Sequence, residues 1–417
     1  MPNSENPSFQ TEKASERILR HANEISACLF KRRAVPKLLE PEDRTLRSFS
    51  LGEVAEILGV SGSYLRQLSI DGLGTTPETG TAGRRSYTLR QINELRAYLA
   101  TSRRKEVLKF CPRRREGEKL QIISVAGSAS TTTSLYLAQG LALQGYRVLA
   151  IDLDPNGSLS KMFGYYFPNI GFPDRCVSMY GALRYDDDRS SMSSVIRPTY
   201  FDGLDLVPGT CELEIFERES TKRFHSEDLR IADASIKMVS ALKEVEANYD
   251  VVVIRCGGGI FLTAGAYGAA TGVLMTVRPE WPEIMSMHIS LSFLSDFVSL
   301  MEEAGMSVNH DFTKFLVTRH NPRDFSQQEA VALLRESLGH DLLPATVWES
   351  DAIRDAEVKK RSLYELVAGA VGRSAYEQAM ETLNSTNAEV MDIIYEVWGR
   401  PRMYVMRASR TAGKASS

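Results

Sequence analysis

The stretch SVAGSASTTTS, residues 124–134, follows an apolar run and leads into a helical pattern that continues to LALQGYRVLAIDLDP. A strand, a turn of small residues and a helix are the order of elements in a phosphate-binding loop. A loop of the kind G-x-x-x-x-G-K-[ST] needs glycines and a lysine, but this stretch has only Gly127 and no lysine. It therefore indicates either a phosphate loop that has lost its chemistry or a loop that never had any.

From Leu120 onward, short aliphatic runs alternate with helical segments. This alternation predicts βαβ units and a mostly parallel sheet. In open α/β sheets the ligand lies beyond the carboxyl ends of the strands, so we expect the opening stretch, residues 152–154 and residues 255–259 around one crevice. The predicted strands are residues 120–125, 146–152, 204–208, 249–255, 272–277 and 313–319.

Composition limits the class of protein. The 417 residues are enough for two domains, and 43% of them are hydrophobic. No run of about 18 apolar residues predicts a membrane span, and the start MPNSENPSFQ lacks a secretory pattern. Five scattered cysteines have no metal-ligand spacing. We therefore expect a cytoplasmic protein with reduced thiols, no metal site of its own and no membrane contact.

The amino-terminal third is basic, whereas the rest is acidic. Residues 1–120 hold 22 Lys/Arg against 15 Asp/Glu, which is typical of a module that meets a polyanion or of a solvated surface. Within residues 10–33, four apolar positions recur at spacings of three and four and predict one apolar helix face. That face needs either the rest of the chain or a second copy, and we favour self-association. The four positions are Ile18, Ala22, Ile25 and Leu29.

Residues 48–98 predict a winged helix-turn-helix. Ser50 and Glu53 form a capping box before one short helix, and Ser61 caps the next after a turn at GVS. A Gly-rich turn then precedes a third helix, which Thr88 and Gln91 cap. The second helix would enter the major groove of double-stranded DNA, and arginines of the wing would contact phosphate or the minor groove. The predicted DNA-binding residues are Ser61, Ser63, Arg66, Gln67, Arg84 and Arg85. A small helical subdomain without DNA is the alternative.

We expect five parts along the chain. The first is an amino-terminal helix in residues 1–45, a candidate for dimerisation. The second is the DNA-binding module in residues 46–105. A charge-rich linker then leads to the large domain, and it is able to add phosphate contacts. The remaining parts are the linker 106–119, the α/β domain 120–400 and a basic tail 401–417.

Several long motifs, in order, resemble one known family. LYLAQGLALQGYRVLAIDLDPNGSLSKMFGY, VIRPTYFDGLDLVPGTCELEIFE, YDVVVIRC and the winged helix are similar to the RepA proteins of repABC plasmids. These are ParA-type partition ATPases with an amino-terminal DNA-binding module, and the resemblance covers about residues 10–400. It implies a deviant P-loop (ParA/MinD-like) fold, ATP with Mg²⁺, a homodimer, and binding to DNA. It also implies a centromere-binding partner of the ParB/RepB type and repression of the protein's own operon.

The resemblance assigns a role to each position of the loop, whose family form is K-G-G-x-G-K-T-T. The family's two lysines fall on Val125 and Ser130, and the carboxylate that anchors magnesium through water falls on Arg255. The magnesium-side hydroxyl Thr131 is kept, as is Asp154, which positions the attacking water. The stretch is thereby identified as a phosphate loop that has lost its chemistry. Backbone N–H groups still attract anions, so the nucleotide-binding candidates are Gly127, Ser128, Ala129, Ser130, Thr131 and Thr132.

These losses predict little or no hydrolysis. Removal of one preorganised group commonly costs about 3–4 kcal/mol of barrier, and here two lysines and a carboxylate are missing together. The family's glycines fall on Ala126, Gly127 and Ala129, and alanine at a positive φ adds strain. Asp154, the retained catalytic candidate, is insufficient alone, and nucleotide binding itself is in doubt.

Three functions remain open from the sequence. The first is a partition and replication-control protein of the RepA/ParA type with impaired ATP hydrolysis. The second is a DNA-binding transcriptional regulator that uses an inactive ParA-like domain as a dimerisation scaffold. The third is an active ATPase with unconventional ligands. Nucleotide-dependent DNA binding separates the first from the second.

Arg255 gives a prediction that the structure tests directly. A guanidinium in the crevice repels a metal and needs acceptors, because it does not lose its proton. The strand that ends at Asp152 should neighbour the strand that ends at Arg255. We therefore predict that Arg255 turns into the crevice and pairs with Asp152 or Asp154; a surface pair is the alternative.

Overall fold

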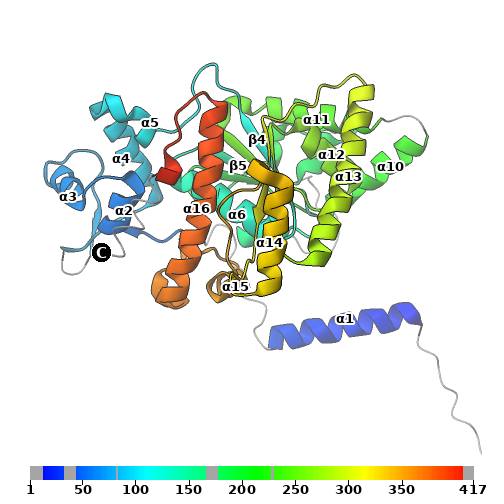
Figure 1. Cartoon of the computed structure of the whole chain (residues 1–417), viewed down its shortest axis with the longest axis horizontal. Coiled ribbons are helices and arrows are strands. Elements are labelled where there is room, and N and C mark those ends of the chain that lie inside the picture. Colours follow the sequence, from blue (N-terminus) through cyan, green and yellow to red (C-terminus); the bar gives the residue numbers. More distant parts are fainter. Residues whose placement is uncertain (1–12, 32–43, 81–82, 166–176, 227–229, 407–417) are drawn as a thin grey trace, which may run out of the picture. The chain divides into compact units, whose positions relative to one another are not determined.

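The computed structural model describes residues 13–31, 44–80, 83–165, 177–226 and 230–406 (Figure 1). The chain divides into two compact units, residues 1–39 and residues 40–417. The described part of the first unit is helix α1 (Ala14–Lys31). Its side chains Ile18, Ala22 and Ile25 are exposed, as the predicted apolar face requires; the side chain of Leu29 lies outside the described part.

A seven-stranded sheet forms the centre of the second unit, in the order β10-β9-β4-β8-β5-β7-β6. Neighbouring strands are parallel throughout, except that β6 pairs antiparallel with β7 at the edge. All six predicted strands are present, and the predicted mostly parallel sheet is confirmed. The two-residue β6 was not predicted. The strands are β4 (Gln121–Gly127), β5 (Val148–Asp152), β6 (Arg197–Pro198), β7 (Leu204–Val207), β8 (Val251–Arg255), β9 (Gly272–Val277) and β10 (Phe312–Val317).

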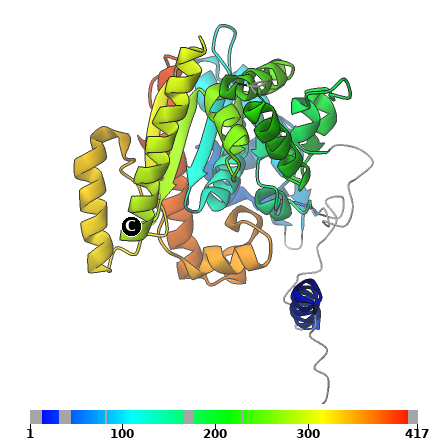
Figure 2. The ribbon, with the colours of Figure 1, turned by 90° about the vertical axis from the view of Figure 1, so that its right-hand side faces the viewer.

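Both faces of this sheet are covered, which explains why its inner strands carry apolar residues on both faces. In β8, for example, Val251 and Val253 belong to one core cluster, whereas Val252 and Ile254 belong to the cluster on the other face. Figures 1 and 2 show helices on both sides of the sheet. A third cluster joins β9 and β10 to α13 and α14.

The helices divide between these clusters. The first cluster holds α6 (Ser130–Gln144), α7 (Ser158–Met162), α15 (Asp351–Val358) and α16 (Arg373–Val397). The second holds α8 (Met179–Leu183), α9 (Met192–Val195), α10 (Glu212–His225), α11 (Ile231–Lys243) and α12 (Ile260–Ala269). The third holds α13 (Trp281–Glu303) and α14 (Phe325–Leu338).

The described amino-terminal part of the second unit has four α-helices and a small antiparallel sheet in the order β1-β3-β2. Its predicted helix starts are confirmed: Ser50 with Glu53 and Thr88 with Gln91 form capping boxes, and Ser61 accepts a hydrogen bond from the Tyr64 N–H. The elements are β1 (Phe49–Ser50), α2 (Leu51–Leu58), α3 (Gly62–Ile70), β2 (Glu78–Thr79), β3 (Arg85–Tyr87), α4 (Leu89–Ser102) and α5 (Val107–Phe110).

This small module is docked firmly on the α/β domain. Arg96 of α4 is buried and donates to the Leu143 carbonyl at the end of α6 over 2.6 Å, and Asn93 donates to Asp202 over 2.8 Å. The predicted linker is packed as well, because Phe110 is fully buried and Arg114 pairs with Glu246. The module and the sheet share one continuous core cluster.

The start of the predicted tail also packs against the domain, up to the last described residue. The Tyr404 side chain is buried with its hydroxyl 3.1 Å from that of Tyr146, and Asp392 accepts hydrogen bonds from the Tyr404 and Val405 N–H groups. The basic sequence from Arg400 onward has few apolar residues and therefore predicts a disordered tail, and this prediction is wrong for residues 400–406. Residues 407–417 lie outside the described part of the chain.

Candidate functional site

The loop between β4 and α6 stands at the carboxyl end of the central strand, where β4 pairs with both β8 and β9. Gly127 has φ +90°, and a Cβ there would lie 2.1 Å from the Thr276 carbonyl oxygen, so only glycine fits. Ala129 has φ +60° at the N-cap of α6, a left-handed conformation that an alanine adopts at a cost of about 1–2 kcal/mol. The backbone at Ala129 thus has a shape that is suited to glycine.

The hydroxyl groups of this loop bind the protein's own carboxylates. Ser128 donates a hydrogen bond to Glu283 at the start of α13, and Thr132 donates to Glu357 in the last turn of α15. Ser130 is buried at the first position of α6, and Thr131 beside it is half-buried. Val125 is fully buried in the core. A phosphate group at this helix N-terminus would compete with Glu283 and Glu357 for the hydroxyls of the loop. It would also find no lysine to pair with, because positions 125 and 130 are valine and serine.

Two aspartates stand where β5 ends. Asp152 is fully buried and accepts hydrogen bonds from the N–H and hydroxyl of Ser160, at 2.9 and 2.7 Å, and from the Asp154 N–H at 3.1 Å. Asp154 accepts from the Asn156 N–H at 3.0 Å and from the Ser158 hydroxyl. Both carboxylates are therefore fixed by the turn that follows the strand.

Arg255 enters this site from β8, and the predicted ion pair is confirmed. Its Nη1 lies 3.0 Å from Asp154 Oδ2, and the side chains are 14% and 6% exposed, so the pair is removed from bulk water. The register of the sheet makes this possible, because Arg255 stands directly opposite Asp152 on the neighbouring strand. Gly257 leaves room for it, since a Cβ at that position would lie 1.9 Å from Nη1. A fixed guanidinium thus occupies the crevice at the carboxyl ends of β5 and β8.

The charges in the crevice shift the pKa values of the two aspartates in opposite directions. Burial raises the pKa of Asp152, and its hydrogen bonds and Arg255 offset this only in part. Burial acts in the same direction on Asp154, but the hydrogen bonds from Ser158 and Asn156 and the charge of Arg255 outweigh it and lower its pKa. Asp154 is consequently ionised at neutral pH and paired.

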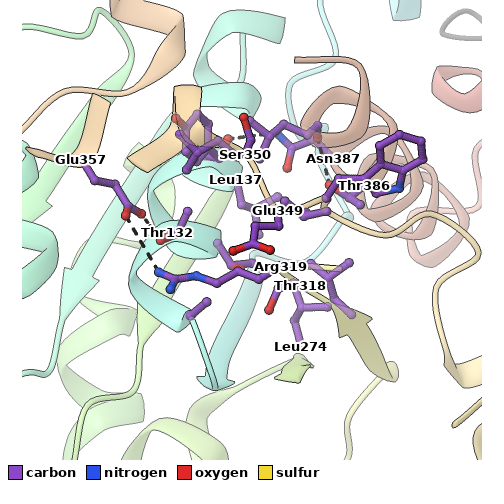
Figure 3. Close-up of a pocket in the computed structure, with 18 of the residues that line it drawn as sticks. Thr132, Leu137, Leu274, Thr318, Arg319, Glu349, Ser350, Glu357, Thr386 and Asn387 are labelled. Atoms are coloured by element: carbon purple, nitrogen blue, oxygen red, sulfur yellow. Dashed lines mark hydrogen bonds and ion pairs between the residues drawn. The ribbon is translucent and has the colours of Figure 1, made fainter. Parts of the chain in front are cut away.

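A cavity of about 290 Å³ opens beside the loop (Figure 3). Ala129 and Thr132 of the predicted site line it, with Arg319 after β10 and Glu357 of α15. Arg319 has φ +51° and its Nη2 lies 3.9 Å from Glu357, which also accepts the hydrogen bond from Thr132 of the loop. Sequence reasoning missed these residues. Further lining residues are Tyr136, Leu137, Leu274, Thr318, Trp348, Glu349, Ser350, Thr386 and Asn387.

The site as a whole is poorly suited to a metal-bound triphosphate. Carboxylates come from Asp152, Asp154, Glu283 and Glu357, and the arginines that face them are already paired. Among the described residues, no group of three His, Cys, Asp or Glu side chains is arranged to hold a metal ion. The backbone N–H groups at the start of α6 remain as anion donors, and the cavity offers space for a small organic molecule.

The predicted DNA-binding residues gather on the small module. Ser61, Ser63, Arg66 and Gln67 are exposed on or beside α3, and Arg84 is exposed just before β3. Arg85 instead is half-buried and donates from Nε to the Ser69 hydroxyl over 3.2 Å, which holds the hairpin against α3. Of the three predicted arginines, Arg66 on α3 and Arg84 before β3 are thus the exposed ones.

Comparison with known proteins places this fold and this loop in context. The model of an AAA domain family, AAA_31, matches residues 121–304. A curated protein of Sinorhizobium fredii (strain NBRC 101917 / NGR234) that carries the name replication protein A is 41% identical over 86% of this chain and 88% of its own. Among solved structures, one titled as a partition protein has a TM-score of 0.62 at 16% identity, covering 93% of this chain and 100% of that one. An ATP complex of a McdA variant from Cyanothece has a TM-score of 0.51 at 15% identity, covering 69% and 99%.

Proposed function

Because the chain belongs to the RepA family of ParA-type partition proteins, we propose that it is a plasmid partition and replication-control protein that binds DNA and self-associates, with little or no ATP hydrolysis. Its partners in this proposal are double-stranded DNA, a second copy of the chain and a centromere-binding protein of the ParB/RepB type. The proposed place of action is the cytoplasm. The McdA structure that holds ATP supports nucleotide as the family's ligand.

The Arg255–Asp154 pair is the observation that carries the reduced hydrolysis. Phosphoryl transfer needs a metal and cations that stabilise charge on the transferring group. Here the retained Asp154 is bound to a guanidinium, at the position of the family's magnesium anchor, and the loop hydroxyls of Ser128 and Thr132 bind glutamates. The crevice is thus filled by the protein's own charges. A nucleotide would have to displace them.

The exposed face of α3 supports the DNA-binding part. Its outward residues include Arg66 at the middle of the helix, and the hairpin that ends at β3 is held beside it by Arg85 and Ser69. In a winged helix-turn-helix, such a helix reads base edges and the hairpin contacts the backbone. We therefore assign a base contact to Arg66 and a phosphate contact to Arg84.

The experiment measures binding of the full-length protein to duplex DNA by fluorescence anisotropy across a salt series, without and with ATP. A selected high-affinity duplex is compared with a random one. We expect Arg66→Ala to cost about 1–3 kcal/mol on the selected duplex only, and Arg84→Ala to weaken both and flatten the salt dependence. The control Arg373→Ala, at an exposed position of α16, should change neither.

Two outcomes would contradict the assignment. If the full-length protein shows no salt-sensitive binding to DNA, the proposed DNA-binding function is wrong. If Arg66→Ala binds the selected duplex as tightly as Arg373→Ala does, the proposed base contact of Arg66 is wrong. DNA affinity that does not respond to ATP favours the alternative, a transcriptional regulator whose ParA-like domain serves as a dimerisation scaffold.

A further inference from the structure

Helix α13 carries an apolar stripe on its outward side that does not pack against the sheet. Its inward side already packs on β9, β10 and α14, through Met287 among others. On the other side, Trp281, Met285, Ile289, Phe293 and Leu300 are between 47% and 61% exposed. At 3.6 residues per turn these five positions fall within an arc of about 120°.

Exposed apolar side chains scattered singly need no explanation, but a contiguous stripe of large ones marks an interaction site. Trp281, Met285, Ile289 and Phe293 follow one another at every fourth residue, so they form one ridge over more than three turns. A soluble helix that packs on a core needs only one apolar face. The second face of α13 is therefore available for a partner.

The charges on α13 indicate which partner fits. The helix contains Glu283, Asp296, Glu302 and Glu303 but no lysine or arginine. By the same helical geometry, Asp296 and Glu303 fall on the arc of the stripe itself. The surface is thus apolar with carboxylates at its carboxyl-terminal half, and it complements an apolar segment that carries cations.

The same charges argue against two other occupants. The length and hydropathy of α13 are those of a membrane span, with a mean hydropathy of 1.4. However, interfacial membrane helices carry lysine and arginine toward anionic lipid, whereas α13 carries only carboxylates. A second copy of α13 would place like charges in contact, which costs free energy in a low-dielectric interface.

We propose that the outward face of α13 is a docking surface for a basic amphipathic helix of a partner protein. The partner's apolar side chains would pack on the ridge from Trp281 to Phe293, and its lysines or arginines would pair with Asp296 and Glu303. Helix recognition through spaced apolar anchors with charge at the edges is a common mode. This proposal rests on neither DNA binding nor nucleotide binding, so it stands or falls separately from the proposed function.

The test uses the full-length protein and a designed helical peptide of about five turns, with a leucine stripe flanked by lysines. A matched peptide has glutamate in place of each lysine. Binding is followed by the fluorescence of Trp281, with Trp281→Phe as the spectral control, and by calorimetry. We expect the lysine peptide to bind at least about tenfold more tightly than the glutamate peptide. Phe293→Ser should weaken it by at least about tenfold, whereas Ser290→Ala, off the stripe, should not.

A charge-swapped variant keeps the proposal falsifiable if Phe293→Ser perturbs the fold. Asp296→Lys with Glu303→Lys changes only exposed or helix-terminal charges, and it should invert the preference toward the glutamate peptide. Equal binding of both peptides, or a preference that does not invert, overturns the proposal. So does binding to vesicles of phosphatidylcholine and phosphatidylglycerol that Phe293→Ser abolishes, since the occupant is then a membrane. A dimer in sedimentation velocity that Phe293→Ser dissociates identifies a second copy instead.

Discussion

At the scale of single residues, the crevice shows which consequences of a substitution can be foreseen. Arg255 was predicted to turn inward because a guanidinium at the end of a buried strand has few acceptors, and the neighbouring strand ends in Asp152. The structure has this pair with Asp154. Glu283 and Glu357 could not be predicted in the same way. They come from helices more than 150 residues away in the chain, and nothing in the local pattern links them to Ser128 and Thr132.

The buried ion pair gives a prediction for stability. Replacement of Arg255 by alanine leaves Asp154 ionised in a site that is only 6% exposed, where loss of one partner costs about 3 kcal/mol or more. Urea denaturation should therefore show a lower midpoint with an unchanged slope. The control Arg373→Ala breaks a fully exposed pair with Glu377, and it should stay within about 0.5 kcal/mol of the parent. Equal stability of the two variants would show that Asp154 does not depend on Arg255.

At the scale of elements, most of the secondary structure follows from local rules. The capping boxes at Ser50 and Thr88 set the starts of α2 and α4, because a side chain and a backbone N–H satisfy each other within four residues. The strands follow from their apolar runs. Strand β6 could not be predicted from its sequence, because it has only two residues, one of them proline, and so shows no periodicity. Local rules also fail for the positive φ of Arg319, which no sequence pattern signals.

The strand–loop–helix element predicts the enzymatic behaviour. The purified protein should turn over ATP no faster than the double variant Thr131→Ala with Asp154→Ala, because the loop contains no lysine and Arg255 pairs with Asp154. Ser130→Lys alone should not restore turnover, since Arg255 still pairs with Asp154. Phosphate release measured with Mg²⁺ and DNA present decides this. Turnover that is robust and disappears with Asp154→Ala would mean that the site uses unconventional ligands.

At the scale of the whole molecule, the sequence predicted that the DNA-binding module and the α/β domain are separate parts, whereas the structure has them in one compact unit. The change from a basic third to an acidic remainder, with a charge-rich stretch between them, predicted a module on a linker. However, Arg114 of that stretch binds Glu246, and Arg400 from the far end of the chain donates to Glu118 of the same stretch. Composition counts charges but does not show that each has a partner in a distant element. The DNA-binding candidates therefore sit on the same compact unit as the crevice.

This joining predicts that residues 40–417 unfold as one cooperative unit. Arg96 is 4% exposed and bonds α4 to the end of α6, so Arg96→Ala removes packing and a charged hydrogen bond between the two parts. We expect a loss of about 2–3 kcal/mol that appears equally in the hydrogen exchange of amides in α4 and in β8. Arg90→Ala on the same helix is the matched control. It breaks only an exposed contact of 3.5 Å to Asp202 and should cost less than about 0.5 kcal/mol. If Arg96→Ala instead destabilises α4 and leaves β8 unchanged, the module unfolds independently and the two parts are thermodynamically separate domains.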